Sequence, residues 1–335
     1  MTCSSPAPLL VLRVLADRRG LPSGLLIEAD AGAAAAAADD ALAAPSIVAA
    51  LGALCDEFSC LYRSSLDVRL ADVLRGQGWT ELAARSLFCA DERLSAALLP
   101  PEARWIDGDW CMAAPAREPA RQAASRALAL QLVQLVAADA DTHEIEALLR
   151  LDPTLSYQLL RLVNSLGMGV ARRITSFGQA LLILGRQQLR RWLNLMLFAA
   201  NKDDIRSPML LARVAVRARS LELLARTRGL DKLTQEQAFM TGMFSLLGVL
   251  FGMPLPAILA PLSISEAVLG ALLHRDGELG ALLDLVECAE RSEPDAVAAR
   301  VMALQMTPCD FNGAIIEANR WMLGALRDSG ARDHG

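Results

Sequence analysis

Aromatic residues are scarce in this chain, and histidine is scarcer still. Only 4% of the 335 residues are aromatic, three are histidine, and alanine and leucine are abundant. A sandwich or barrel rich in aromatic and β-branched residues is therefore not expected, whereas close-packed helices are. With 53% hydrophobic and 21% charged residues, the chain must bury a large core. We predict a mainly α protein.

Long apolar runs are also missing. No stretch approaches the roughly 18 to 20 apolar residues that span a bilayer, and no basic segment leads into an apolar one at the N-terminus. The seven cysteines are odd in number and never stand in Cys-x-x-Cys spacing, which is typical of reduced structural thiols. We therefore expect a cytoplasmic protein without a membrane span.

The usual catalytic motifs do not occur. The histidines His143, His274 and His334 are not followed by Asp, and no two of them are four residues apart. The chain has neither the Gly-x-Ser-x-Gly of a serine hydrolase nor the Gly-x-x-x-x-Gly-Lys-Ser/Thr of a phosphate-binding loop. The residues thus predict no reactive centre of these classes.

Acidic residues are absent from positions 153–202. Residues 153–228 carry thirteen Lys and Arg against three Asp and Glu, so all the net negative charge lies elsewhere. Such a segment can contact an anion or an acidic protein, or its arginines can cap helices and pair internally. Because basic residues are not interleaved with aromatics, we do not expect nucleic-acid binding. The candidate interaction residues are Asn164, Ser165, Arg172, Arg173, Arg186 and Arg190.

The chain divides by pattern into three parts. In residues 1–115, short apolar runs at 9–15, 24–30, 58–64 and 105–112 predict strands. Residues 116–327 are apolar at helical spacing and punctuated by caps, with helices expected at 207–229 and from Thr307 to about 326. Residues 328–335 form a polar tail.

The segment 145–200 resembles the HDOD domain, an HD-related output module of bacterial signalling proteins. The resemblance rests on the order of an acidic-Pro cap at Asp152-Pro153, a Leu-rich helix, Val163-Asn164-Ser165, Ile174-Thr175-Ser176, Ala180-Leu181 and Leu184-Gly185. It implies a multi-helical fold and coupling to a signalling pathway through a protein partner.

Segments 242–247, 262–273 and 277–287 are similar to the extension found where HDOD follows an EAL domain. Because a closed eight-stranded α/β barrel needs about 200 residues or more, the N-terminal 115 resemble a truncated, degenerate EAL region. Glu28 ends a predicted strand, but no Asn, Asp-Asp or Lys stands at useful spacing. The literal Glu146-Ala147-Leu148 falls inside a predicted helix and is not expected to bind a metal.

The stretch from Ala238 to Gly248 resembles the segment that carries adjacent His and Asp ligands in HD-type phosphohydrolases. Ser245 and Leu246 stand in place of that pair, and neither is a good metal ligand. We therefore expect no metal, no cofactor and no enzyme activity, and interpret the chain as a non-catalytic signalling protein. One alternative is an HD-like phosphohydrolase or cyclic-dinucleotide phosphodiesterase with non-standard ligands. Another is a nucleotide-binding sensor without turnover. The oligomeric state stays open.

Overall fold

The computed structural model describes residues 8–29, 45–56, 58–94, 99–115, 204–262 and 264–330, with individual residues between 131 and 147. Six strands of this part form one sheet in the order β4-β3-β2-β1-β6-β5. They are β1 (Leu10–Ala16), β2 (Pro22–Ala29), β3 (Ser59–Tyr62), β4 (Thr80–Glu81), β5 (Leu87–Cys89) and β6 (Trp105–Asp107).

Five of the six strands share one direction. β1 is antiparallel to both of its neighbours, β2 and β6, while β2, β3 and β4 are mutually parallel and β5 is parallel to β6. The carboxyl ends of β2 to β6 therefore lie at the same edge of the sheet. In parallel α/β sheets this edge is where ligands bind.

The sheet is curled into a half-barrel. Leu15, Leu26 and Leu61 form a separate apolar cluster, against which Leu82 and Leu87 pack. Leu82 follows β4 and Leu87 belongs to β5, and these two strands are at opposite edges of the sheet. Both can reach one cluster only because the sheet bends around it.

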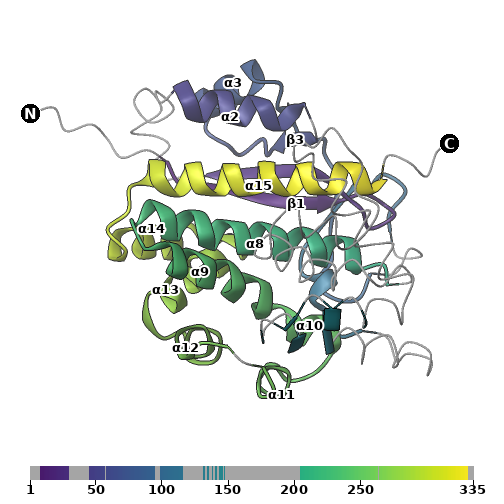
Figure 1. Ribbon diagram of the computed structural model, residues 1–335. Helices are drawn as coiled ribbons and strands as arrows, with labels where there is room; N and C mark the ends of the chain where they lie inside the picture. The colour runs from purple at the N-terminus through teal and green to yellow at the C-terminus, as the bar shows by residue number, and fades with distance from the viewer. Residues whose placement is uncertain are drawn as a thin grey trace, which may run out of the picture.

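Helices cover the other face of the sheet and build the rest of the molecule (Figure 1). α2 and α3 lie beside β3, and α15 packs against α2, β1 and α8, so the last helix joins the sheet to the helical part. The helices are α2 (Pro45–Cys55), α3 (Val68–Gly76), the 3-10 turn η2 (Trp110–Met112), α8 (Ser207–Thr227), α9 (Lys232–Ser245), α10 (Leu247–Phe251), α11 (Leu255–Leu259), α12 (Glu266–His274), α13 (Gly277–Glu290), α14 (Pro294–Ala303) and α15 (Pro308–Gly330).

One buried side chain ties the end of the chain to its beginning. Asn312 of α15 accepts a hydrogen bond from the Leu10 N–H through Oδ1 at 2.8 Å, and its Nδ2 donates to the Pro8 carbonyl at 2.8 Å. Asn312 is 2% exposed. The two backbone groups at the start of β1 are thus satisfied by a helix some 300 residues later in the chain, which fixes where α15 docks.

α8 and α9 approach each other closely at Gly242. A Cβ atom on Gly242 would stand 2.4 Å from the Ala218 Cα, so the two helices touch backbone to backbone there. The absence of a side chain at this position is what allows the approach.

We expect Gly242→Ala to lower the free energy of unfolding by about 1 to 3 kcal/mol, because the added methyl group must push α8 and α9 apart. Gly313→Ala is the matched control, since a Cβ at that helical glycine would have, apart from its chain neighbours and the backbone of its own helix, no described atom within 4 Å. The control should be stabilised by about 0.5 to 1 kcal/mol. Urea unfolding followed by circular dichroism measures both, and equal effects would contradict the tight crossing.

The prediction of a mainly α fold preceded by a small α/β region is confirmed for the helical part, whereas the N-terminal part is a six-stranded sheet, so the whole is mixed α/β. All four predicted strands exist, and the helices predicted at 207–229 and after Thr307 are α8 and α15. β4 and β5 were missed because two or three residues are too few to show an alternating pattern. The domain boundaries stay a prediction. Within the described residues, no helix combines the length and apolarity needed to cross a membrane.

Candidate functional site

The position of the missing His-Asp pair lies at the end of α9. Ser245 is the last residue of this helix, and Leu246, which is 1% exposed, is its C-cap. Gly242 precedes Ser245 by three residues and therefore lies on the same face of α9. Since Gly242 touches Ala218, that face brings Ser245 next to Arg217 of α8.

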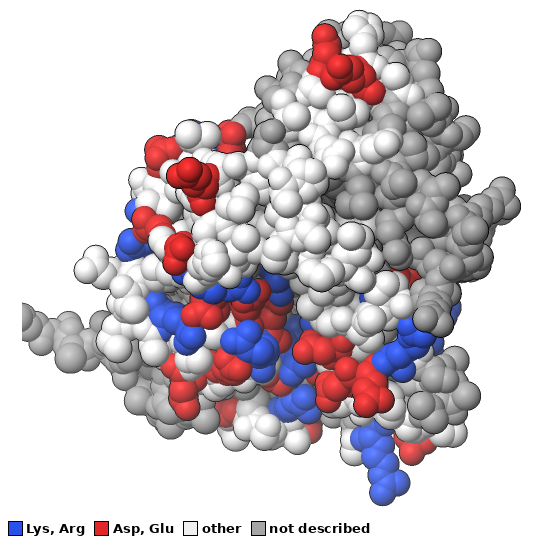
Figure 2. All heavy atoms as spheres, turned by 90° about the horizontal axis from the view of Figure 1, so that it is seen from below, with Lys and Arg blue, Asp and Glu red and all other residues white. Residues whose placement is uncertain are grey.

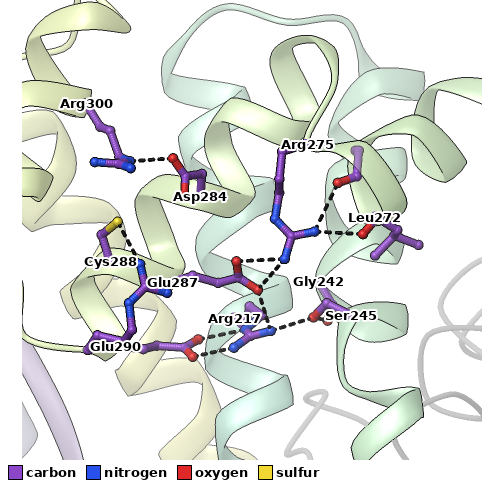
Figure 3. Close-up of polar contacts among 12 residues, drawn as sticks. Arg217, Gly242, Ser245, Leu272, Arg275, Asp284, Glu287, Cys288, Glu290 and Arg300 are labelled. Carbon is purple, nitrogen blue, oxygen red and sulfur yellow. Dashed lines mark hydrogen bonds and ion pairs between the residues drawn. The ribbon is translucent and has the colours of Figure 1, made fainter. Parts of the chain in front are cut away.

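Arg217 fills the space in front of Ser245 (Figure 3). Its Nη1 donates to the Ser245 Oγ at 2.9 Å and to Glu287 Oε1 at 3.3 Å. Its Nε donates to Glu290 Oε1 at 2.8 Å, and Nη2 donates to the other oxygen of the same carboxylate. The Arg217 side chain is only 5% exposed, so one buried guanidinium joins α8, α9 and α13.

These partners stabilise the positive charge of the buried Arg217. Burial by itself lowers the pKa of Arg217, but the charge and hydrogen bonds of Glu290, followed by the charge of Glu287, outweigh burial and raise the pKa overall. A buried ion of one sign without a partner is strongly destabilising, whereas a geometrically matched pair is not. The guanidinium and the two carboxylates therefore form one electrostatic unit.

A second arginine closes the cluster from α12. Arg275 donates from Nη2 to Glu287 Oε2 at 2.9 Å and from Nη1 to the Leu272 carbonyl at 2.7 Å. It is the C-cap of α12 with φ of 60°. A Cβ on Gly280 would lie 2.2 Å from the Arg275 carbonyl carbon, so this backbone position also needs a glycine beside it. Glu287 is thus held between two arginines.

This cluster does not fit a metal ion. Guanidinium groups donate hydrogen bonds and have no lone pair to offer a cation, and Ser245 is already the partner of Arg217 and donates to the Gly242 carbonyl at 2.7 Å. The described residues hold no group of three His, Cys, Asp or Glu side chains that could bind a metal.

A second charged cluster lies at the carboxyl edge of the half-barrel, and we call it the sheet rim. Arg63, just after β3, donates to Glu28 of β2 at 3.2 Å, and Arg13 of β1 pairs with Asp107 of β6 at 2.7 Å. Because side chains alternate along a strand, Glu28, Arg13 and Arg63 face the same way as Leu26, Leu15 and Leu61. The charged residues of the sheet rim therefore lie on the same face of the curled sheet as the apolar cluster of Leu15, Leu26 and Leu61.

Charges from both ion pairs of the sheet rim act on Cys89, the last residue of β5. Partial burial raises the pKa of the Cys89 thiol, and the charge of Asp107 adds to this, while Arg63 and Arg13 act in the opposite direction. The side chains of Arg13 and Arg63 are 21% and 40% exposed, and Glu28 is 25% exposed. The guanidinium groups of Arg13 and Arg63 are thus partly accessible to an anionic ligand at the carboxyl edge of the sheet.

The two clusters are connected by further polar contacts. Arg13 also donates to the Ser292 Oγ, just beyond α13, at 3.3 Å. Arg213 of α8 pairs with Asp109 at 2.6 Å and donates to the Gly108 carbonyl, both in the loop after β6. Figure 2 shows blue and red atoms gathered between paler surfaces, with both signs mixed.

None of the predicted interaction residues can be placed, because all lie outside the described residues. The predicted contact surface, made of Asn164, Ser165, Arg172, Arg173, Arg186 and Arg190, stays a prediction. Sequence reasoning also missed Arg217, Glu287 and Glu290. A signal for the two carboxylates was present, since Glu287 and Glu290 stand at i, i+3 near the end of α13 and share a face.

Comparison with known proteins identifies the helical part. Residues 125–255 match the family described as the HDOD domain. The chain carries an HDOD domain. The HDOD domain includes α8, α9 and α10, hence Arg217 and Ser245, whereas Glu287 and Glu290 lie beyond its matched end. The resemblance found at residues 145–200 is confirmed for the HDOD domain, but not for an EAL region.

Two curated relatives share sequence with this HDOD-containing chain. Cyclic di-GMP phosphodiesterase CdgJ of Vibrio cholerae is 35% identical over 196 residues, which are 58% of this chain and 45% of CdgJ. YuxH of Bacillus subtilis is 30% identical over 147 residues, which are 43% of this chain and 35% of YuxH. The chain spans less than half the length of either relative.

The match to CdgJ contradicts two expectations. The chain was expected to be a non-catalytic protein acting only through a partner, and not to be an enzyme. The missing His-Asp pair motivated both, yet CdgJ is a phosphodiesterase. The absence of the His-Asp motif excludes only the metal site that this motif would form, and it does not exclude catalysis elsewhere in the protein. Both predictions are therefore wrong.

Two solved structures resemble the chain weakly. A phosphohydrolase candidate from Shewanella amazonensis SB2B superposes with a TM-score of 0.44 at 14% identity, over 60% of this chain and 93% of that one. An HDOD domain protein from Geobacter sulfurreducens superposes with a TM-score of 0.29 at 19% identity, over 61% and 64%. Neither likeness carries weight for function.

Proposed function

We propose that this protein acts on cyclic di-GMP as a phosphodiesterase in bacterial signalling. The observation that carries the proposal is the 35% identity over 196 residues to a cyclic di-GMP phosphodiesterase. We further propose that the sheet rim is where the substrate binds and that the N-terminal half-barrel is a truncated EAL-type region.

The geometry of the sheet rim supports the proposal. Cyclic di-GMP carries two phosphodiester anions, and arginine guanidinium groups bind such oxygens through strong, charge-assisted hydrogen bonds. Arg13 and Arg63 bring two guanidinium groups to the carboxyl edge of parallel strands. Each is neutralised by a carboxylate, so a bound phosphate would compete with Asp107 or Glu28 for its arginine.

Hydrolysis needs a positioned phosphate, positive groups beside its oxygens and a base for the water. One water adds across one phosphorus–oxygen bond, which leaves a phosphate monoester on one nucleotide and a free hydroxyl on the other. Glu28 is the candidate base for the water, because its partner Arg63 lies within 3.2 Å and would leave it when it turns to the phosphate. In this arrangement Arg63 and Arg13 bind the substrate, Glu28 takes one proton from the attacking water, and the leaving oxygen takes up a proton from solvent to become the free hydroxyl.

The test is hydrolysis by the full chain. Purified protein is incubated with cyclic di-GMP in buffers with and without Mg²⁺ or Mn²⁺, and the nucleotides are separated by ion-exchange chromatography. We expect a linear dinucleotide to accumulate with time. Glu28→Gln should lower the rate about a hundredfold or more, as expected for loss of a general base, whereas Arg63→Ala should chiefly raise the KM.

Arg19→Ala is the matched control. Arg19 is an exposed arginine that pairs with Asp17 in the turn between β1 and β2, at the opposite end of the strands from the sheet rim. Arg19→Ala should leave the rate of cyclic di-GMP hydrolysis unchanged. Failure of the wild-type chain to hydrolyse cyclic di-GMP under any of these conditions would refute the proposed activity. Full activity in both Glu28→Gln and Arg63→Ala would refute the sheet rim as its site.

A further inference from the structure

The cluster around Ser245 contains a buried arginine where HD-type phosphohydrolases hold a metal ion. In the HD-type segment that residues 238–248 resemble, two side chains at positions 245 and 246 hold a cation. In this protein Ser245 instead accepts a hydrogen bond from the buried Arg217, whose other donors face Glu287 and Glu290. A positive charge is therefore present at this place, but it is covalently attached to α8.

We propose that the Arg217 guanidinium has taken the place of a bound metal ion in this helical domain, as a permanent internal cation. Arg217 supplies the positive charge beside Glu290 and shares Glu287 with Arg275, and its three nitrogens reach both α9 and α13. This inference concerns the helical part alone and does not depend on the activity proposed for the sheet rim.

Three observations carry the inference. The guanidinium is buried and its Nη1, Nη2 and Nε all have partners, so it is held in one orientation. Its partners are two carboxylates and a hydroxyl, which are oxygen donors of the kind that hard cations also prefer. Gly242 brings α9 so close to α8 that Arg217 occupies the space beside Ser245. A metal ion at this place would have to displace the Arg217 guanidinium, which is covalently attached to α8 and cannot diffuse away.

The inference predicts what happens when the internal cation is removed. Arg217→Ala removes the arginine that pairs with Glu290 and leaves Glu287 with Arg275 as its remaining partner. A small external cation should then bind in the space beside Glu290. We expect the melting temperature of Arg217→Ala to fall well below that of the wild type. Millimolar guanidinium or Mn²⁺ should then recover much of the loss, whereas sodium chloride at matched ionic strength should not. The wild type should show no such response to either ion.

Arg217→Lys and Arg217→Gln provide the matched pair. Lysine keeps a positive charge in the same space, so Mn²⁺ should not change the melting temperature of Arg217→Lys. The neutral Arg217→Gln should be stabilised by Mn²⁺ as Arg217→Ala is. If the alanine variant does not fold, the lysine and glutamine variants still decide the matter. Adding Glu290→Gln to either neutral variant should abolish the response, because one of the two carboxylates has then gone.

Three outcomes would overturn the inference. One is a stoichiometric metal in the wild-type protein, found by elemental analysis and lost in Ser245→Ala. Another is an equal response to Mn²⁺ in the wild type, Arg217→Lys and Arg217→Gln. The third is a neutral variant that responds to neither guanidinium nor Mn²⁺. None of these measurements uses cyclic di-GMP hydrolysis, so they do not depend on whether the sheet rim is active.

Discussion

Replacing Ser245 with His and Leu246 with Asp in one protein is expected to lower the free energy of unfolding by about 2 to 4 kcal/mol. Leu246 is 1% exposed, so the new carboxylate would be buried without a partner arranged for it. The imidazole would take the place of the hydroxyl that Arg217 binds at 2.9 Å and would crowd the guanidinium. Restoring the ligand pair should therefore damage the helical core rather than rebuild a metal site.

Urea unfolding of the double variant, with and without Mn²⁺, measures this loss. Leu233→Asp is the control, since Leu233 lies on the same helix but is 66% exposed, and it should change stability by no more than about 0.5 kcal/mol. An unchanged midpoint for the double variant, or a gain in stability with Mn²⁺, would indicate that the space beside Ser245 is open to a metal.

Asn312→Ala is expected to lower the free energy of unfolding by about 2 to 4 kcal/mol, because two buried backbone groups lose their partner together. The Leu10 N–H and the Pro8 carbonyl both bond to this one amide at 2.8 Å. Without it the start of β1 and the docking of α15 are no longer held to each other. Hydrogen exchange should therefore rise at Leu10, in addition to the shift in the unfolding midpoint.

Asn319→Leu is the control on the same helix. Asn319 is equally buried, but its Nδ2 bonds only to the Ile315 carbonyl one turn earlier, and its Oδ1 has no hydrogen-bond partner among the described residues. Removing it costs a local bond and relieves an unsatisfied acceptor, so a change within about 1 kcal/mol is expected. Similar losses in both variants would show that the bridge to β1 has no special role.

The sequence predicted the elements whose pattern is local. Ser207-Pro208 and the apolar spacing after it marked the start of α8, and the short apolar run at 9–15 marked β1. The order of motifs from Asp152 to Gly185 indicated the HDOD domain, which comparison confirmed. The replacement of His-Asp by Ser245-Leu246 was also visible. The conclusion that the protein lacks catalytic activity was wrong. The loss of the ligand pair at one site gives no information about the other sites of the protein.

Only the tertiary structure decided which charges meet. Arg217 reaches Ser245 and Glu290, which are 28 and 73 positions away in the chain, through a crossing that depends on Gly242 and Ala218. The same holds for Glu28 with Arg63 and for Arg13 with Asp107, which meet because of strand order and curl. Local periodicity determines which face of an element is apolar. The partner of a buried charge is determined by long-range packing, and no pattern within a single helix or strand contains that information.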